Sequence, residues 1–171
     1  MTSSDTSAIP VFVGDLPVDR PVVSSDAAMD ETSLLLCPEQ VEQLRFLAEL
    51  SYPFEACGLL VGRRVGTEGS VLQIYQTRNV SENGARRYAI DPEELLAAEA
   101  EAREQGLELI GFWHSHPNHA AEPSASDVAV AWKGYSYLIA GMDALGGVEV
   151  RSWRLVGPSM IEEPIRLRRA L

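Results

Sequence analysis

The sequence predicts a single domain of the α/β class, in which helices and strands alternate around one sheet. The 171 residues are enough for one well-buried core and too few for two full-sized domains. Apolar residues make up 46% of the chain, an ordinary share for a globular protein. Helix signals with clear starts and stops lie between short apolar runs bounded by glycine and proline, which are typical of strands.

The first 32 residues are expected to form an N-terminal extension, either flexible or an extended arm, outside a domain of residues 33–171. They are rich in serine, threonine, aspartate and proline and show no sustained period of strand or helix. One short apolar run within them, from Ile9 to Val13, could add a strand to a sheet edge or to a partner.

The first helix is expected to begin at Pro38, since proline is favoured at the first helical position, and to end before Pro53. Its apolar positions recur at helical spacing: Val41, Leu44, Leu47 and Ala48. The run EACGLLVGRR then predicts a buried strand, and SVLQIYQTRNV predicts a second strand with two different faces. We expect these strands to form a hairpin across Gly66 to Gly69.

The second helix has the clearest boundaries in the chain. Asp91 is placed as its N-cap, Pro92 follows at the first helical position, and Gly106 ends it. Glu94 is positioned to close a capping box with Asp91. LELIGFWHSH is then expected to be a central strand, and PSASDVAVAWKG a short helix entered through Ser124. SYLIAGM and GGVEVRSWRLV predict two further strands.

All three histidines lie within residues 111–127, GFWHSHPNHAAEPSASD. His114 and His116 are two residues apart, so a strand directs both imidazoles to one face, where they can share a metal ion. Asp127, at the start of the short helix, can supply a carboxylate as the third ligand. Such a set leaves the fourth tetrahedral position of zinc open for a water whose pKa falls to about 7, which is typical of catalytic sites. His119 is a competing ligand, interpreted as a solvent-facing loop residue.

Other chemistries use parts of this pattern. A cupin also pairs H-x-H with a later glutamate, here Glu122, but its flanking glycines and a further histidine are missing. A non-haem iron site has the same ligand count and stays open as an alternative. A zinc deaminase would need a P-C-x-x-C pair, which is absent. Cys57 could act as a thiol nucleophile, although a cysteine in an apolar run is more often packing.

Charge and composition argue against nucleic acids and membranes as partners. A net charge of −11 without a basic stripe argues against binding to nucleic acid. Cys37 and Cys57 are too few for a disulfide framework. No stretch approaches the ~20 apolar residues of a membrane span, and the N-terminus lacks the pattern of a secretory signal. We therefore expect a soluble, cytoplasmic protein that does not act on membranes.

The run HSHP followed by PSASD forms H-x-H-x10-D with a serine three residues before the aspartate. This pattern closely resembles the motif of the JAMM (MPN-plus) zinc metallopeptidases, and YPFEACGLLVG resembles the segment that carries the catalytic glutamate of that family. The similarity extends from about Leu34 to Leu167, including TRNV and RRYAIDPEEL.

The resemblance implies a single mixed, largely antiparallel curved sheet flanked by helices, with the cytidine-deaminase-like architecture of JAMM/MPN domains. It implies zinc held by His114, His116 and Asp127. By the same resemblance, Glu55 acts as general base and then general acid, and Ser124 stabilises the oxyanion. Simpler readings are that Glu55 pairs with Arg63 or Arg64 and that Ser124 only caps the helix.

The chain lacks long insertions and so resembles the compact prokaryotic members of the family. These act on the C-terminal Gly-Gly tail of ubiquitin-like or sulfur-carrier proteins, which we expect as partners here. The strand Val71 to Gln76 and the loop after Asn79 could border a groove that receives such a tail by strand addition. The alternative is a non-catalytic MPN-type scaffold or partner-binding domain. The sequence also allows a homodimer.

Overall fold

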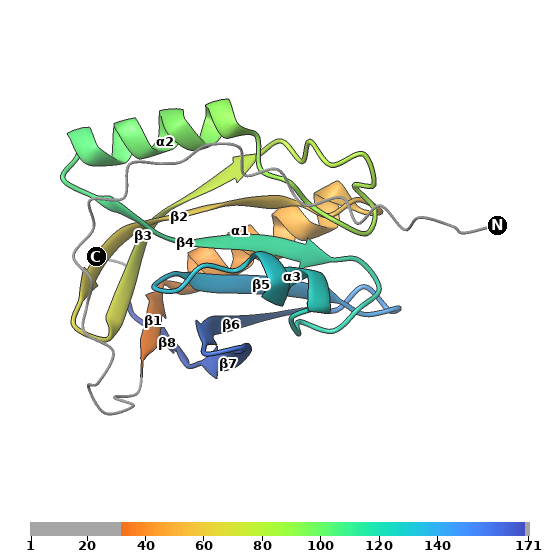
Figure 1. The fold of residues 1–171 in the computed structure, drawn as a ribbon. Helices are drawn as coiled ribbons and strands as arrows, with labels where there is room; N and C mark the ends of the chain where they lie inside the picture. The colour runs from red at the N-terminus through yellow and green to blue at the C-terminus, as the bar shows by residue number, and fades with distance from the viewer. Residues whose placement is uncertain (1–31, 170–171) are drawn as a thin grey trace.

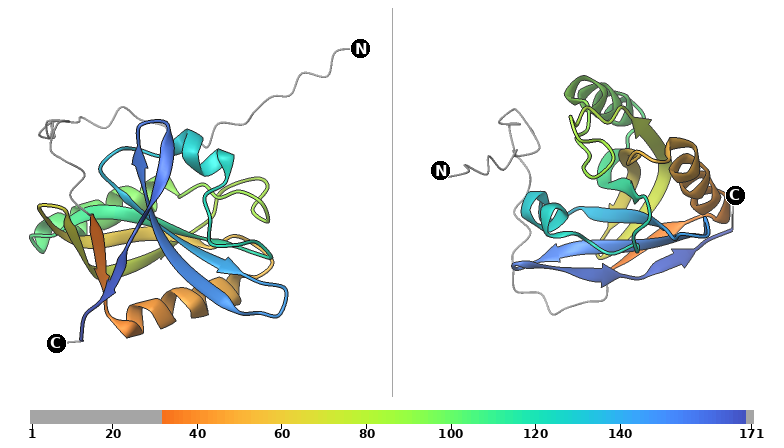
Figure 2. Two further views of the ribbon diagram at one scale, coloured as in Figure 1. Left: turned by 90° about the horizontal axis from the view of Figure 1, so that it is seen from below. Right: turned by 90° about the vertical axis from the view of Figure 1, so that its right-hand side faces the viewer.

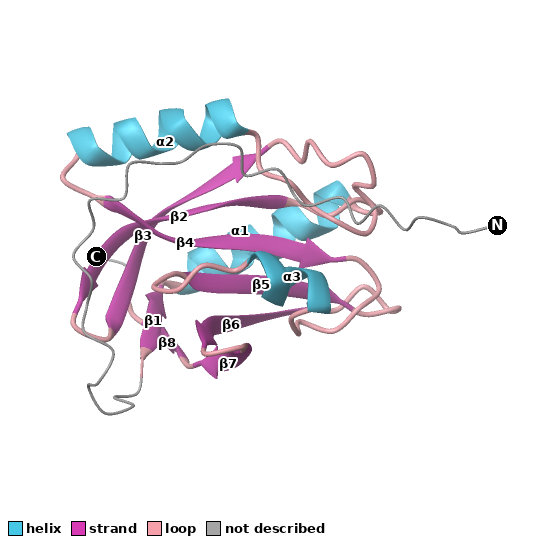
Figure 3. Cartoon of the chain, in the orientation of Figure 1, coloured by secondary structure: helices cyan, strands magenta, loops and turns pink. Residues whose placement is uncertain are grey.

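The computed structural model describes residues 32–169. The predicted N-terminal extension, including the apolar run at residues 9–13, therefore lies outside the described residues. Within them, no helix is both long and apolar enough to cross a bilayer. The described chain forms one mixed sheet with helices packed against it (Figures 1 and 3).

The sheet has eight strands in the order β7-β6-β5-β4-β2-β3-β1-β8. Their bounds are β1 Ser33–Leu36, β2 Cys57–Val65, β3 Glu68–Thr77, β4 Glu108–His116, β5 Ser136–Met142, β6 Val148–Val156, β7 Ser159–Glu163 and β8 Ile165–Leu167. The pairs β2·β3, β2·β4, β5·β6 and β6·β7 are antiparallel, whereas β1·β3, β1·β8 and β4·β5 are parallel. The predicted mixed, largely antiparallel sheet is confirmed.

The sheet curls strongly, and its strand order gives the reason. β7 and β8 stand at opposite ends of that order, yet only Pro164 separates them in the chain. A flat sheet of eight strands spaced by about 4.8 Å could not place its two edges one residue apart. The two ends must therefore approach each other, and Figure 2 shows the resulting curvature.

Two helices cover opposite faces of the sheet. Leu44 of α1 (Pro38–Ser51) shares a core with Trp113 of β4, and Leu95 of α2 (Pro92–Glu104) shares a second core with Phe112 of the same strand. Because successive residues of a strand point to opposite faces, these two cores lie on the two sides of the sheet. The third helix, α3 (Ala125–Val130), follows the histidine strand.

Most predicted elements are present at the expected places. The hairpin of β2 and β3 turns at residues 66–67, where Gly66 has φ of 59°, a conformation that favours glycine. β4 is buried except for its first residue and lies fourth among the eight strands, as expected for a central strand. The strands β1, β7 and β8 were not predicted.

One predicted cap is wrong. Asp91 does cap α2, since its side chain accepts a hydrogen bond from the backbone N–H of Glu93. Glu94, however, does not close a capping box. Its carboxylate accepts from the backbone N–H of Arg78 at 2.7 Å and from Arg78 Nε at 2.9 Å. Glu94 therefore binds the charged Arg78, which directly follows β3, and not the helix terminus that the local pattern predicted.

Candidate metal centre

The two histidines that the sequence places on one strand face lie side by side at the C-terminal end of β4. His114 is 1% exposed and His116 is 7% exposed. Strand alternation sets them on the same face as Phe112, which is the face that α2 covers. His116 pairs with Gly141 of the parallel strand β5, and His114 pairs with Cys57 of β2.

Asp127 returns to this point through the loop of residues 117–124 and the first turn of α3. Ser124 is the N-cap of that helix, as predicted, and Asp127 at N3 completes a capping box with it. The backbone N–H and hydroxyl of Ser124 donate to Asp127 Oδ2 at 2.7 and 2.6 Å. The helix cap thus fixes the carboxylate in place, and the helix-terminus role and the ligand role coincide in one residue.

The loop between the histidines and α3 is held against the sheet by two contacts. Trp153 Nε1 donates to the carbonyl of Ala121 at 2.9 Å. Gly141 allows the loop to lie directly on β5, since a Cβ at this position would meet the backbone nitrogen of Ala121 at 2.2 Å. The neighbouring carbonyl of Ala120 accepts from His116 Nδ1 at 3.2 Å, which fixes the ring of this histidine.

The three side chains converge. His114 Nε2 and His116 Nε2 are 2.9 Å apart, and their distances to Asp127 Oδ1 and Oδ2 are 3.3 and 3.4 Å. Two donors that each lie 2.0–2.1 Å from one tetrahedral zinc ion are separated by about 3.3 Å. All three ligand atoms lie within 4.8 Å of one another. The donor set and its spacing therefore fit one small divalent cation.

The electrostatics of the trio follow from burial and mutual contact. Burial disfavours the charged form of Asp127, but hydrogen bonds from His114, His116 and Ser124 outweigh it and hold the pKa of the carboxyl well below its usual range. Burial lowers the pKa of His114, which favours the neutral imidazole that binds metals. For His116 burial acts in the same direction, but the contact with Asp127 raises the pKa.

Glu55 lies two residues before β2. The antiparallel register pairs Cys57 with His114, so its continuation by two residues sets Glu55 beside His116. Glu55 is only 8% exposed. The pKa of Glu55 is raised to about 7. Burial is the main cause, the charge of His116 opposes it, and the charge of Asp127 adds to it. Arg64 does not neutralise Glu55, because that guanidinium lies near Glu163 and donates to Ser136.

Two residues that hold Glu55 in place escaped the sequence analysis. Ser115 Oγ accepts from the backbone N–H of Ala56 at 2.8 Å, and the Ser115 N–H donates to the Ala56 carbonyl at 2.9 Å. Asn79 Nδ2 donates to the carbonyl of Glu55 at 3.0 Å. The only signals were the position of Ser115 between the histidines and that of Asn79 in the segment TRNV.

The competing residues lie elsewhere. His119 is exposed in the loop, as predicted, and it is not among the clustered ligands of the described chain. Glu122, the ligand of the cupin alternative, instead pairs with Arg151 at 3.1 Å. Cys57 is fully buried, and burial raises the pKa of its thiol to about 11, which keeps it protonated at neutral pH and disfavours the thiol nucleophile.

An open groove of about 460 Å³ borders Glu55. It extends from the end of α1 to the end of β3. Its lining residues are Ser51, Phe54, Glu55, Ala56, Gln76, Thr77, Arg78, Asn79 and Glu94.

Comparison with known proteins identifies the family. The family described as prokaryotic homologs of the JAB domain (Prok-JAB) matches residues 38–156, which include the three clustered side chains and Glu55. The chain belongs to this family. The match leaves out β1, β7 and β8.

Curated relatives of this Prok-JAB chain carry enzyme names. A desampylase of Haloferax volcanii is 33% identical over 102 residues, which are 59% of this chain and 70% of the relative. A desampylase of Pyrococcus furiosus is 33% identical over 96 residues, covering 56% and 65% of the two chains. A probable TtuB-protein conjugate cleaving protease of Thermus thermophilus is 34% identical over 93 residues, covering 54% and 60%.

Two solved structures share the fold of this Prok-JAB chain. A protein from Desulfitobacterium hafniense superposes with a TM-score of 0.72 at 33% identity, over 81% of this chain and 94% of that one. A protein from Salinibacter ruber superposes with a TM-score of 0.61 at 31% identity, over 80% and 92% of the two chains.

Proposed function

We propose that this Prok-JAB protein is a zinc-dependent metallopeptidase of the JAMM type. It hydrolyses the amide bond after the C-terminal Gly-Gly of a ubiquitin-like or sulfur-carrier protein. The observation that carries the proposal is the convergence of His114, His116 and Asp127 within 4.8 Å, beside the buried carboxyl of Glu55. The relatives named desampylase and TtuB-protein conjugate cleaving protease support the class of substrate.

His114 and His116 would hold the zinc through Nε2, and Asp127 through a carboxylate oxygen. Two histidines and one carboxylate are a donor set of catalytic zinc sites, which keep a position open for substrate or water. When bound, zinc supplies a Lewis acid for the substrate carbonyl and lowers the pKa of a coordinated water to about 7. Hydrogen bonds from its neighbours keep Asp127 in the charged carboxylate form that binds a metal ion.

Glu55 performs the proton transfers in this proposal. Burial raises the pKa of this carboxyl to about 7 in the metal-free protein. A carboxylate beside the metal can accept a proton from the attacking water and return it to the leaving amine. Amide hydrolysis needs both steps, because an amine leaves poorly without a proton. Hydrogen bonds from Asn79 and to Gly84 hold the backbone of Glu55 on both sides of its Cα.

Ser124 is proposed as the donor to the oxyanion that forms on the substrate carbonyl. Ser124 is an exposed residue, and its hydroxyl donates to Asp127 Oδ2 at 2.6 Å, adjacent to the ligand trio. The role requires this O–H to turn from the carboxylate to the substrate, where it would stabilise developing negative charge. The backbone N–H of Ser124 continues to hold Asp127 after that turn.

The substrate tail is proposed to add to the outer edge of β3. β1 pairs with this edge only across Glu68–Ser70, and the carbonyl of Val71 is taken by Gln40 and Arg168. In the described part of the chain no strand pairs with this outer edge of β3 beyond that point, while β2 pairs with the other edge. An extended tail on Leu72–Thr77 would enter the groove toward Glu55, and glycines without side chains would pass where larger residues cannot.

The test of substrate class uses carrier-tail peptides that end in Gly-Gly or Ala-Ala before an amide-linked reporter. We expect cleavage of the Gly-Gly peptide and far slower cleavage of the Ala-Ala peptide, measured by mass spectrometry of the products. Equal rates would contradict the proposed selectivity. The same assay is run on conjugates of intact ubiquitin-like proteins. The natural carrier is the one whose conjugate loses the mass of the attached group.

The test of mechanism separates an enzyme from a scaffold. Glu55→Gln should retain zinc and lose turnover, because the amide keeps the shape of the side chain but cannot carry the proton. A scaffold would show no turnover in the unsubstituted protein either. Retained cleavage by Glu55→Gln would reject the assignment of Glu55 as base and acid.

A further inference from the structure

The two histidines of the proposed zinc site are held in different ways. His116 donates through Nδ1 to the carbonyl of Ala120. His114 Nδ1 is buried and has no hydrogen-bond partner in the described chain. Metal-binding histidines almost always fix their second ring nitrogen by a hydrogen bond, which sets the orientation of the ring. Another contact must therefore orient the ring of His114.

That contact is the ring of Tyr88. It stacks on His114 with a centroid distance of 4.3 Å and an angle of 22° between the planes. The ring of His116 meets His114 edge-on, at 4.7 Å and 61°. With the ring of Tyr88 stacked on it and the ring of His116 against it, His114 has little freedom to rotate about χ2, the torsion that aims Nε2.

The loop between β3 and α2 brings Tyr88 to this place, and Asn79 organises that loop. Asn79 Nδ2 donates to the carbonyl of Arg87 at 3.0 Å, and Asn79 Oδ1 accepts from the N–H of Ala89 at 3.1 Å. These are the residues immediately before and after Tyr88. Because Asn79 Nδ2 also donates to the carbonyl of Glu55, one side chain fixes the backbone on both sides of Tyr88 and next to the proposed base.

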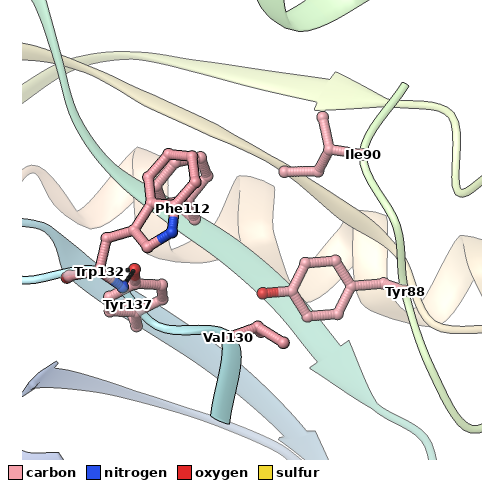
Figure 4. A pocket seen from close by; sticks show the side chains of 6 residues that line it. All are labelled: Tyr88, Ile90, Phe112, Val130, Trp132 and Tyr137. Atoms are coloured by element: carbon pink, nitrogen blue, oxygen red, sulfur yellow. Dashed lines mark hydrogen bonds between the residues drawn. The ribbon is translucent and has the colours of Figure 1, made fainter. Parts of the chain in front are cut away.

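The hydroxyl of Tyr88 is not part of the ring contact with His114. Figure 4 shows it directed into a small pocket lined by aromatic and apolar side chains. The other lining residues are Ile90, Phe112, Val130, Trp132 and Tyr137. The hydroxyl forms no hydrogen bond with any residue of the described chain, so the ring, rather than the O–H group, makes the contact that matters for His114.

We propose that Tyr88 is a positioning residue for the metal site, which orients His114 by ring stacking in place of the missing hydrogen bond at Nδ1. This inference rests on the proposed function only in that His114 binds the metal. Tyr88 is neither a metal ligand nor a proton-transfer group in this proposal. It acts on the affinity and the coordination geometry of the ion through His114.

The experiment compares Tyr88→Phe, which keeps the aromatic face, with Tyr88→Met, which keeps much of the volume without a ring. Zinc affinity is measured by competition with a chromophoric chelator, and ligand geometry by the visible absorption of the Co²⁺-loaded protein. We expect Tyr88→Phe to match the unsubstituted protein in both. Tyr88→Met should bind zinc on the order of 10- to 100-fold more weakly, as for losses of other groups that orient metal ligands, with an altered Co²⁺ spectrum.

Ile90→Ala is the matched control, because Ile90 lines the same pocket without a ring contact to His114. It should lose thermal stability and keep zinc affinity. Unchanged affinity and spectrum in Tyr88→Met would overturn the inference, and Tyr88→Leu replaces Tyr88→Met should that chain not fold. Failure of the unsubstituted protein to bind zinc would overturn both the metal site and this role, whereas zinc binding without peptide cleavage would overturn the proposed function alone.

Discussion

Ser115 lies between the two histidines, but its side chain binds the backbone of Ala56 and not the metal site. Alternation points its side chain away from the face of His114 and His116, where its hydroxyl accepts from the N–H of Ala56. Ala56 is 3% exposed and directly follows Glu55. The hydroxyl therefore ties the segment of the proposed base to the strand of the proposed ligands.

Ser115→Ala is expected to leave the Ala56 N–H buried without an acceptor, at a cost of about 1–3 kcal/mol in the free energy of unfolding. Turnover should fall by on the order of tenfold or more, since a small displacement of a catalytic group is costly, while zinc content stays unchanged. The control is Ser136→Ala, which removes another buried hydroxyl, one that accepts from Arg64. Equal turnover in both folded variants would refute the link to Glu55.

The raised pKa of Glu55 gives a stability test in metal-free protein. Because the folded pKa of about 7 exceeds the ordinary glutamate value of 4.5, this carboxyl stabilises the fold at low pH, and that contribution is lost as the pH rises from 4.5 through 7. The shift corresponds to about 3 kcal/mol. Glu55→Gln should therefore gain stability relative to the unsubstituted protein by up to that amount between pH 4.5 and pH 8, measured by urea unfolding with a chelator.

Glu39 provides a control of opposite sign. A hydrogen bond from its own backbone N–H lowers the pKa of this exposed carboxyl, and a contact with Cys37 lowers it further. Glu39→Gln should lose relative stability as the pH rises. A difference between Glu55→Gln and the unsubstituted protein that stays constant with pH would contradict the burial of a shifted carboxyl at this position.

At the scale of residues, the sequence predicts those side chains whose roles follow from spacing. The two-residue step of His114 and His116 and the capping position of Asp127 both survive in the structure. Glu94 was assigned wrongly, because its partner Arg78 is 16 residues away and a local motif cannot register it. The contacts of Ser115, Asn79 and Tyr88 were not predicted for the same reason.

At the scale of elements, the site depends on how the loop of residues 117–124 packs on β5. Gly141→Ala would place a Cβ 2.2 Å from the nitrogen of Ala121 and 2.5 Å from the carbonyl carbon of Ala120. Both are backbone atoms, so the loop itself must move. Its movement would withdraw the carbonyl that fixes His116.

We expect Gly141→Ala to weaken zinc binding by on the order of 10- to 100-fold, as measured by chelator competition. The control, Gly111→Ala, lies on the same pair of strands at the opposite end, where its Cβ would meet the carbonyl oxygen of Ser136 at 2.3 Å. That variant should lose stability but retain zinc affinity once folded. Zinc affinity reduced equally in both variants would show that general destabilisation, and not the loop, sets the affinity.

The elements that the sequence predicts are those with strong local signals. Capped helices and strands of seven or more residues were found, whereas β1, β7 and β8 have only four, five and three residues. β1 and β8 are defined by their pairing with segments far away in the chain, whereas β7 is a short strand that pairs with its neighbour β6. A pattern confined to a few residues does not specify such pairing.

At the scale of the whole molecule, the curl of the sheet brings the chain ends of the domain together. β1 pairs with β8, and Leu34 and Leu36 of β1 are fully buried in the core. This pairing of the first and last strands explains why the sequence pattern alone did not predict the curvature, which only the family resemblance implied. It depends on contacts between residues about 130 positions apart, which no local period encodes.

We propose that residues 33–171 form a domain that folds without the first 32 residues. A chain that begins at Ser33 should fold, bind zinc and cleave the Gly-Gly peptide at the rate of the full chain, because the N–H of Ser33 already bonds to Thr67. A chain that begins at Pro38 lacks β1 and should not fold cooperatively, as judged by thermal unfolding. Loss of cleavage in the folded chain from Ser33 would assign part of the activity to the first 32 residues.

Zinc content by elemental analysis tests the central claim most directly, in the unsubstituted protein, Glu55→Gln and His116→Ala purified in parallel. The account predicts one zinc ion per chain in the first two and none in His116→Ala. An unsubstituted protein that does not take up zinc, or a His116→Ala variant that retains it, would contradict the account.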